Sequence, residues 1–349
     1  MREVGLLFLR LGLLGFGGPA AHIALMREEV VRRRGWLSEA EFLDLVGAVN
    51  LLPGPNSTEL AIHIGLRQAG LPGLLVAGVA FIFPATLLVL GFAWAYVRFG
   101  HLPAVLAGWN GAKPVVVAVV ALAVLAFGRT AVRARGAWLA AATALALALA
   151  GVPELAALLA GGTASLLFYQ ARPGTAAGVV GLDWLLWYFL KVGSVLYGSG
   201  YVLLSFLRGG LVERARLLSE SQLLDAVAVG QITPGPVFTT ATFVGYLLRG
   251  VPGALVATVG IFLPAFVLVG LGGPLVTWLR RTPRARAFLD GVNAAAVALM
   301  GLVVVQLGHS ALTSVPALVV LLASFGLLSA GVNSAWLIAG GAVAGLLFP

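Results

Sequence analysis

The chain has 349 residues, of which 60% are hydrophobic and only 10% are charged, and its mean hydropathy is +1.02. A soluble globular domain carries about 25% charged residues, so this composition excludes one and predicts an integral membrane protein. The net charge of +9 does not indicate a nucleic-acid partner, because the basic residues lie in short clusters between apolar segments, where they set membrane orientation. The lack of cysteine excludes disulfides, thiolate metal sites and thiol redox chemistry.

The first apolar segment is predicted at residues 4–24, and the glycine-rich stretch Gly15–Pro19 breaks it. A basic amphipathic stretch then continues to Arg34. Two short apolar pieces follow, at residues 41–52 and 57–68. Each is shorter than the roughly 20 residues that a membrane-spanning helix needs, so neither is expected to cross the bilayer alone.

The motif Pro53-Gly54-Pro55 separates these two short pieces. We therefore predict a re-entrant helical hairpin, which a membrane protein tolerates only where irregular backbone is buried in protein or lines a watery cavity. Continuous spans are predicted after the hairpin, at residues 72–97, 111–127, 136–150 and 152–169.

The second half of the chain repeats the first. The motif Asn50-Leu51-Leu52-Pro53-Gly54-Pro55 recurs, 181 positions later, as Gln231-Ile232-Thr233-Pro234-Gly235-Pro236. One residue is then lost, and the offset becomes 180, so Gly65 matches Gly245. We therefore divide the chain into an N-terminal membrane repeat at 1–171, a linker at 172–183 and a C-terminal membrane repeat at 184–349.

Equivalent polar pairs also occur in the two repeats. Ser38-Glu39 and Ser219-Glu220 each precede an apolar segment, and Asp44 and Asp225 follow them at the same spacing. Serine ahead of acidic residues is typical of a helix N-terminus, so both pairs are predicted to cap helices.

Each repeat is predicted to hold about five transmembrane helices plus the hairpin, which is an odd number of crossings, so the second repeat is expected to be inverted. Loop charges support inversion. The loop with Arg129, Arg133 and Arg135 matches residues 309–315, which hold no lysine or arginine. The loop that holds only Arg98 matches the arginine cluster at 280–286. The fold class is thus an all-α integral membrane protein of two inverted repeats, with the N-terminus outside, although Arg208, Arg214 and Arg216 oppose this orientation.

Arg10 and Lys191 are cations inside apolar segments, at equivalent positions of the two repeats. Charged groups at membrane depth are costly and usually face the interior of a helix bundle. Inverted symmetry would place both near the midplane, on opposite sides of a pseudo-two-fold axis, where they could hold a dianion from two directions. The alternative is that each extends to an interface or pairs with a carboxylate.

The glycine-proline breaks predict helices that begin inside the membrane. Such helix starts present unsatisfied N–H groups and the positive end of the helix dipole, and they bind anions. Pro55 predicts one start, with Asn56 or Ser57 as its N-cap, and Pro236 predicts another; a simple tight turn is the alternative at each. The candidate substrate-binding residues at the breaks are Gly17, Gly18, His22, Asn50, Gly54, Asn56, Ser57, Ser199, Gln231 and Gly235.

Glu59 follows the first Pro-Gly-Pro turn and has no carboxylate counterpart, because Thr240 takes its place in the second repeat. A carboxylate in a partly dry site can carry a proton, as coupled transport requires, and His22 is a second candidate for this role. An ion pair with a nearby arginine is the alternative for Glu59. Glu59 and His63 have the i, i+4 spacing of two metal ligands, but one such pair is weak, and no metal site or other cofactor is predicted.

These residues resemble the chromate ion transporter family. The resemblance rests on Phe16-Gly17-Gly18-Pro19-Ala20-Ala21-His22, Trp36-Leu37-Ser38, Pro53-Gly54-Pro55-Asn56 and Pro234-Gly235-Pro236, and it covers essentially the entire chain. It implies a two-domain carrier in the inner (plasma) membrane of a bacterium or archaeon, which expels chromate with energy from the proton-motive force. The second repeat departs from the pattern, since Tyr197-Gly198-Ser199-Gly200 replaces the glycine-rich stretch and Leu203 stands where the first repeat has His22.

The function expected from the sequence is therefore proton-coupled export of chromate. Sulfate is an alternative substrate because it is also a tetrahedral dianion of similar size. An anion channel would share the electrostatics but needs a continuous pore. An intramembrane enzyme would need a catalytic pattern, and no Ser-His-Asp, His-Glu-x-x-His or phosphate-loop pattern is present. Small and aliphatic residues on many helix faces are compatible with a homodimer.

Overall fold

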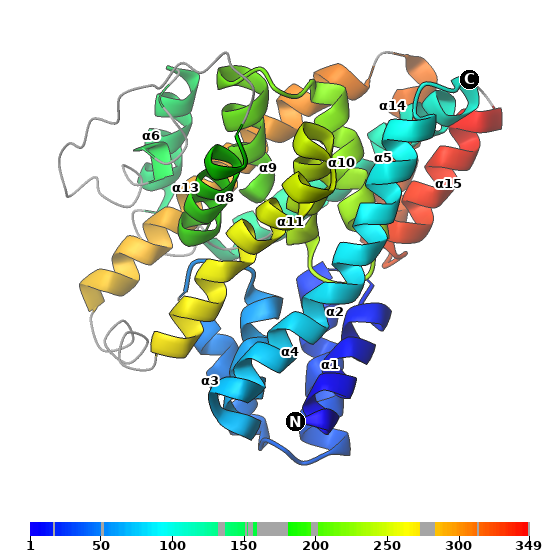
Figure 1. Ribbon diagram of the computed structural model, residues 1–349. Coiled ribbons are helices and arrows are strands. Elements are labelled where there is room, and N and C mark those ends of the chain that lie inside the picture. Colours follow the sequence, from blue (N-terminus) through cyan, green and yellow to red (C-terminus); the bar gives the residue numbers. More distant parts are fainter. Residues whose placement is uncertain are drawn as a thin grey trace.

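The computed structural model describes residues 1–16, 18–49, 52–131, 137–150, 152, 156–158, 181–196, 202–272, 283–312 and 314–347. Within these ranges all regular elements are helical (Figure 1). The first half contains α1 (Arg2–Leu14), α2 (Gly18–Arg27), the π-helix η1 (Glu28–Arg33), α3 (Glu39–Val49), α4 (Asn56–Phe99), α5 (Pro103–Ala131) and α6 (Ala137–Leu149). The second half contains α8 (Leu182–Val195), α9 (Val202–Leu207), the π-helix η2 (Arg208–Arg214), α10 (Glu220–Ile232), the short η3 (Val237–Thr239), α11 (Thr240–Leu271), α13 (Pro283–Ala311), α14 (Val315–Ser329) and α15 (Ser334–Leu347).

The described elements at the start of the two halves follow a similar order. A broken pair of helices, α1 and α2, matches α8 and α9, and a π-helical turn follows each pair. The predicted break in the first segment is confirmed, because α1 ends at Leu14 and α2 begins at Gly18. Predicted spans 72–97, 111–127 and 136–150 fall in α4, α5 and α6, whereas most of 152–169 lies outside the described residues, as do residues 172–180 of the linker.

The expected helix caps are confirmed. The Ser38 N–H donates to Glu41 Oε2 at 2.9 Å, and the Glu41 N–H donates back to Ser38 Oγ at 3.3 Å. Ser219 and Gln222 form the same reciprocal pair at the start of α10, at 2.9 and 3.1 Å. Each reciprocal pair, known as a capping box, satisfies N–H groups that would otherwise lack a partner at the start of the helix. The positions at which α3 and α10 begin are therefore well defined.

Long helices of each half fold back on themselves. In α4 the backbone leaves the helical region at Ala69 and Gly70, and in α11 it does so at the equivalent Arg249 and Gly250. The two arms then pack side by side: a Cβ atom added at Gly78 would meet Ile62, 2.8 Å away. In the second half, the equivalent contact is a 2.7 Å hydrogen bond between the hydroxyls of Thr242 and Thr258. The separation of the short piece 57–68 from the span 72–97 is thus confirmed.

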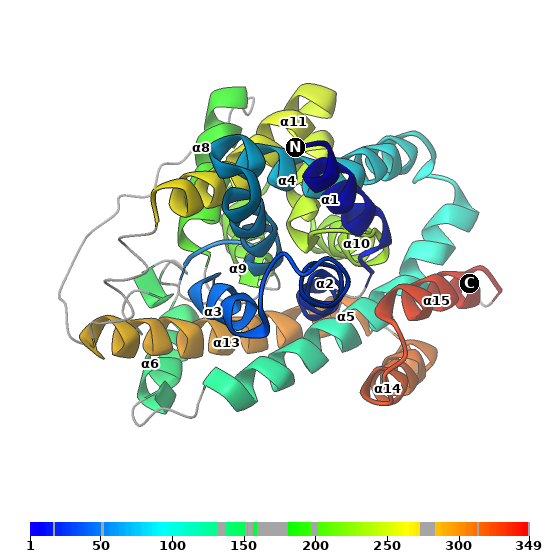
Figure 2. The ribbon, with the colours of Figure 1, turned by 90° about the horizontal axis from the view of Figure 1, so that it is seen from below.

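The halves interlock through their long helices. α4 packs on α11, and α5 packs on α13, which lies alongside it (Figure 2). In addition, α5 packs against α14 and α15 of the other half, and α13 packs against α6. The largest hydrophobic core contains residues of both halves, so the core is built across the repeat boundary.

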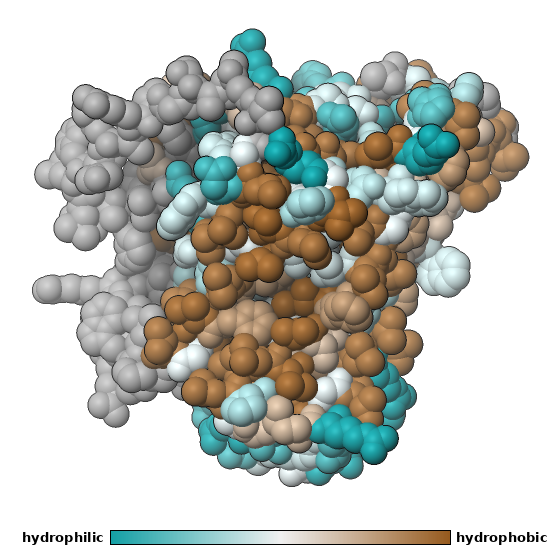
Figure 3. Space-filling model, in the orientation of Figure 1, coloured by the Kyte–Doolittle hydropathy of each residue, from teal (hydrophilic) through white to brown (hydrophobic). Residues whose placement is uncertain are grey.

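The described chain contains four helices that are long and apolar enough to cross a membrane: Asn56–Phe99, Pro103–Ala126, Val237–Leu271 and Gly291–Ala311. Shorter apolar helices, such as Val315–Ser329, accompany them. Hydrophobic side chains cover the middle of the face in Figure 3, and hydrophilic side chains gather at its upper and lower ends. Composition, helix length and surface together make this an all-α, multi-pass membrane protein.

Candidate functional site

Two backbone hydrogen bonds bring the helix breaks of one half to the Pro-Gly-Pro turn of the other. The Gly54 N–H donates to the Leu196 carbonyl at 2.8 Å, and the Gly235 N–H donates to the Gly15 carbonyl at 2.9 Å. The two bonds join equivalent positions, because Gly54 matches Gly235 and Gly15 matches Leu196. All four residues are buried, so this reciprocal pair of bonds lies within the protein.

Both turns require glycine at their centre. Gly54 has φ +144° and Gly235 has φ +94°, which L side chains rarely adopt. Space is also restricted: a Cβ atom at Gly54 would meet the Glu59 carboxyl group, and one at Gly235 would lie 2.7 Å from Ala85 Cβ. Glycine therefore allows the first turn to pack against the Glu59 carboxyl group and the second turn to approach the first half closely.

A helix begins directly after each turn. Pro55 occupies the N-cap position of α4 in an extended conformation (φ −79°, ψ 93°), and no side chain caps the helix. The expectation that Asn56 or Ser57 would be the N-cap is therefore wrong, because the extended residue is Pro55 and Asn56 is already helical. At the start of α4, the Glu59 N–H donates to the Pro55 carbonyl at 2.9 Å. The uncapped N-terminus of α4 retains its donors and the positive end of its dipole.

Glu59 lies in the first turn of α4 and is fully buried. Neither carboxylate oxygen has a hydrogen-bond partner within the described ranges. At the equivalent position, Thr240 satisfies its hydroxyl by donating to the Val237 carbonyl at 2.8 Å. An isolated buried carboxylate is costly to keep ionised, so it is a candidate functional group rather than a stabilising one.

His22 has a different environment. Its Nε2 lies 2.8 Å from the Gly15 carbonyl, and its ring packs edge-on against Phe81. A carbonyl only accepts hydrogen bonds, so Nε2 carries the proton and donates it. The Gly15 carbonyl thus accepts from both His22 and Gly235, and His22 fixes the break between α1 and α2.

Arg10 and Lys191 are exposed on α1 and α8 and form neither an ion pair nor a hydrogen bond with other described residues. Each lies five residues before the carbonyl that holds the opposite turn, which is about 7.5 Å of helical rise. Both cations are exposed and thus lie outside the buried core that contains Glu59.

The other predicted site residues are divided between the core and the undescribed parts of the chain. Gly18 is buried at the start of α2, and Gln231 is buried near the end of α10, beside the second turn. Ser57 is buried in the first turn of α4, and Asn56 is half-buried there. Gly17, Asn50 and Ser199 lie outside the described residues.

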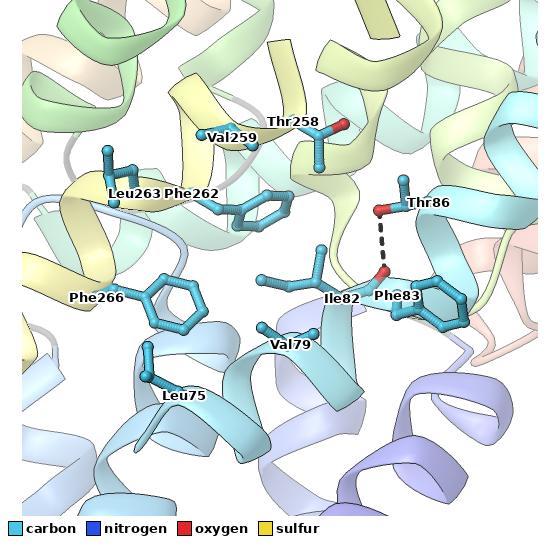
Figure 4. Close-up of a pocket in the computed structure, with 10 residues that line it drawn as sticks. All are labelled: Leu75, Val79, Ile82, Phe83, Thr86, Thr258, Val259, Phe262, Leu263 and Phe266. Atoms are coloured by element: carbon cyan, nitrogen blue, oxygen red, sulfur yellow. Dashed lines mark hydrogen bonds between the residues drawn. The ribbon is translucent and has the colours of Figure 1, made fainter. Parts of the chain in front are cut away.

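Two pockets lie near these elements. A cleft of about 360 Å³ lies between parts of α4 and α11. Its lining consists of apolar side chains plus Thr86 and Thr258 (Figure 4). Because the lining carries no charge, this cleft does not suit a dianion. A pocket of about 280 Å³ beside η2 is lined by Ser205, Arg208 and Arg214, but Arg208 pairs with Glu213 and Glu220.

Sequence reasoning missed one buried acid. Asp225 is only 2% exposed and accepts a hydrogen bond from the Tyr96 hydroxyl at 2.8 Å, whereas its equivalent Asp44 is exposed. No sequence signal separates the two aspartates, because both follow a capped helix start at the same spacing.

A sequence profile described as chromate transporter matches this chain twice, over residues 2–166 and 184–346. The chain belongs to the chromate transporter family. It is 32% identical to the chromate transport protein of Cupriavidus metallidurans over 372 aligned residues, which cover 99% of this chain and 93% of that protein. It is 32% identical to the chromate transport protein of Pseudomonas aeruginosa over 343 residues, which cover 90% of this chain and 82% of that protein.

A further relative matches only part of the chain. The uncharacterized transporter YwrB of Bacillus subtilis is 34% identical over 136 residues, which cover 39% of this chain and 68% of that protein. No solved structure matches the chain. The relatives from Cupriavidus and Pseudomonas are named as chromate transport proteins.

Proposed function

We propose that this protein is a secondary active transporter that exports chromate across the inner membrane in exchange for protons, with sulfate or another tetrahedral oxyanion as the alternative substrate. Family membership supports this proposal, since the relatives from Cupriavidus and Pseudomonas are named chromate transport proteins. The observation that carries it is the reciprocal pair of backbone bonds, from Gly54 to Leu196 and from Gly235 to Gly15. Through these bonds, the discontinuous helices of both halves meet in one buried region.

In this proposal the two halves are inverted repeats, and each Pro-Gly-Pro turn is the tip of a re-entrant hairpin. The arrangement of α3, the turn and the first arm of α4 supports this, because the fold at Ala69–Gly70 turns the chain back before the long arm begins. Discontinuous helices that meet in this way are a recurrent feature of transporter substrate sites. The hairpins also explain why irregular backbone is tolerated at this depth, because it is buried in protein.

The oxyanion would bind at the helix N-termini next to the turns. Backbone N–H groups at the start of α4 and α2, with Asn56, Ser57 and Gln231 nearby, would supply hydrogen-bond donors. Arg10 and Lys191 would supply positive charge from two sides. Their exposure supports a role in which they meet an anion along the surfaces of α1 and α8, rather than one in which they neutralise Glu59.

Glu59 would carry the coupled proton. It lies beside Gly54 and is buried without a partner within the described part of the chain, so a proton on the carboxyl group would remove an uncompensated charge. His22 is less suited to this role, because its Nε2 proton is committed to the Gly15 carbonyl. The proton and the oxyanion would then occupy neighbouring positions at the first turn.

The test is uptake of labelled chromate and labelled sulfate into everted membrane vesicles, with and without an acidic interior. An antiporter moves protons out of such vesicles as it moves the oxyanion in, so we expect uptake that depends on the gradient. Arg10→Ala and Lys191→Ala should each lower uptake by about 10-fold or more, because a hydrogen bond to a charged group contributes about 1.5–3 kcal/mol. Arg98→Ala, which removes an exposed arginine near the end of α4, is the matched control and should transport normally.

Glu59→Gln should abolish gradient-driven uptake and leave gradient-free exchange of the labelled anion intact. Normal transport in both cation variants would refute the proposal that Arg10 and Lys191 hold the oxyanion from two sides. Gradient-driven uptake of sulfate without chromate would retain the mechanism and replace the substrate, whereas a lack of flux of both anions would refute the proposed function.

A further inference from the structure

The second half contains a buried carboxylate that the proposed function does not use. Asp225 lies in α10, and its Oδ2 accepts a 2.8 Å hydrogen bond from the hydroxyl of Tyr96, near the end of α4. Its Oδ1 is buried and has no hydrogen-bond partner among the residues that the structure describes. The carboxylate is therefore half satisfied: one oxygen is fixed, and the other can accept a proton.

Aromatic rings surround the donor of this bond. Tyr96 packs edge-on against Trp109 at 5.5 Å and against Phe243 at 5.3 Å between ring centroids. These contacts fix the Tyr96 hydroxyl in place without satisfying Oδ1. A purely structural link between α4 and α10 would need only the one bond to Tyr96, and an amide in place of the carboxylate could provide it without burying a charge.

Among the described residues, two titratable groups on neighbouring elements act electrostatically on Asp225. They are Tyr96 of α4 and Lys113 of α5, and Lys113 is half-exposed and donates to Asn110 Oδ1 at 2.8 Å. At the outer end of α10, Arg208 of η2 pairs with Glu220 and Glu213. The charge of Lys113 thus acts on Asp225, which itself remains buried.

The position of Asp225 along α10 is intermediate between the protein surface and the second turn. The helix starts after the exposed Ser219 and ends at Ile232, so Asp225 lies about 9 Å of helical rise from Ser219 and about 10.5 Å from the end next to the second turn. Glu59, in contrast, lies at the tip of the other hairpin. The two buried carboxylates therefore occupy different depths of the protein.

We propose that Asp225 is a second proton-carrying residue of the transport cycle, which binds a proton on Oδ1 while Tyr96 holds Oδ2. This inference rests on the proposed proton-coupled function. In the step, a proton from water forms an O–H bond at Oδ1, and the charge of Asp225 changes from −1 to zero. Release of the proton restores the carboxylate. Because Tyr96 and Asp225 belong to different halves, the step changes the electrostatics of the contact between the halves.

The test uses the full-length purified protein in liposomes, with two assays of the labelled anion that the wild type transports. One assay measures uptake driven by a proton gradient, and the other measures exchange without a gradient. Asp225→Asn preserves the shape and the acceptor for Tyr96 but cannot titrate. We expect gradient-driven uptake to fall roughly tenfold or more and to lose its pH dependence, while exchange is retained, because the variant lacks an intramembrane proton site.

Two further variants complete the test. Asp44→Asn removes the equivalent but exposed carboxylate and should leave both assays unchanged. Asp225→Glu keeps a titratable group and should retain part of the gradient-driven uptake. An Asp225→Asn protein with wild-type uptake and pH profile would overturn the proposal, as would one that is folded but has lost both assays, since that would indicate a structural role. If the wild type itself shows exchange but no response to a proton gradient, proton coupling fails for Glu59 and Asp225 alike.

Discussion

Gly54 and Gly235 are the residues on which contact between the halves depends most directly. Each combines a positive φ with little space for a side chain, because a Cβ atom at Gly54 would overlap the Glu59 carboxyl group and one at Gly235 would lie 2.7 Å from Ala85 Cβ of the other half. An alanine at either position therefore meets both backbone strain and steric overlap. We expect Gly54→Ala and Gly235→Ala each to destabilise the protein by about 2–4 kcal/mol, the sum of the two effects, and to abolish transport.

Thermal unfolding in detergent and vesicle uptake would measure these effects. Gly326→Ala is the control, because Gly326 lies within α14 and a Cβ atom there meets no other atom within 4 Å. This control should match or slightly exceed the wild type in stability, since alanine favours a helix over glycine. Equal stability of all three variants would contradict the role assigned to the turns.

His22 allows a second prediction at the residue scale. Its bond to the Gly15 carbonyl has no counterpart in the second half, where Leu203 replaces it and the Leu196 carbonyl still accepts from Gly54. We expect His22→Leu to lower stability by about 0.5–1.5 kcal/mol, as for the loss of one hydrogen bond, and to keep gradient-driven transport. Loss of proton dependence in this variant would instead make His22 the coupling residue.

At the scale of the element, the folds within α4 and α11 depend on one glycine each. Gly70 has φ 62° and ψ −154°, and Gly250 has φ 60° and ψ −151°. This combination is essentially restricted to glycine. A Cβ atom at Gly250 would meet nothing within 4 Å, so any effect of a substitution there comes from the backbone alone.

We therefore expect Gly70→Ala and Gly250→Ala each to destabilise the protein by about 1–3 kcal/mol, with similar values because the two folds are equivalent. Thermal unfolding checks the size of the effect, and a cysteine pair introduced at the contact of the two arms of α11, Thr242→Cys with Thr258→Cys, checks the geometry. If either alanine variant unfolds like the wild type, the fold-back does not depend on the glycine conformation.

The sequence predicted where the helices of α4 and α11 lie along the chain, but not how their arms pack in space. The short length of residues 57–68 predicted a boundary between helices before residue 72, and the structure confirms it. The sequence did not show that the two arms fold together, because that depends on contacts between distant positions, such as Thr242 with Thr258. Likewise, the span was predicted to start at residue 111, but α5 begins at Pro103. The polar Asn110 and Lys113 lower the local hydropathy, so the sequence pattern did not show the earlier start.

The candidate site was predictable to the same extent. Recurrence of Pro-Gly-Pro identified the two turns, and the lack of a counterpart identified Glu59. The partner of each turn was not predictable in detail, because the Gly54 to Leu196 bond joins residues of different halves. Asp225 was indistinguishable from Asp44 for the same reason, since only packing against Tyr96 buries one of them.

At the scale of the whole molecule, long helices of each half pack against helices of the other half. α5 of the first half packs against α14 and α15 of the second, and the contact with α15 is close enough to require glycine. A Cβ atom at Gly111 would overlap the Gly341 carbonyl and Gly345, and one at Gly341 would lie 2.7 Å from the Gly111 carbonyl. In a membrane, where association depends on close packing rather than on the hydrophobic effect, such small-residue contacts are a main source of stability.

This interlocking predicts that neither half is stable alone. In this protein α5 and α13 each pack on helices of the other half. We expect fragments 1–171 and 184–349 to be degraded when produced separately, and to restore gradient-driven transport when produced together. Vesicle uptake and the amount of each fragment in the membrane measure the outcome.

Adjacent glycines in α15 provide the decisive comparison. Gly341 is buried against α5, whereas Gly340 is exposed and a Cβ atom there meets nothing within 4 Å. Gly341→Val in the second fragment should therefore prevent complementation, because the added side chain separates α5 from α15, and Gly340→Val should not. The two variants have the same composition and differ only in which face of the helix carries the added bulk. Equal complementation by both would mean that the halves associate without the α5–α15 contact, and assembly would then depend on the crossing of α4 with α11.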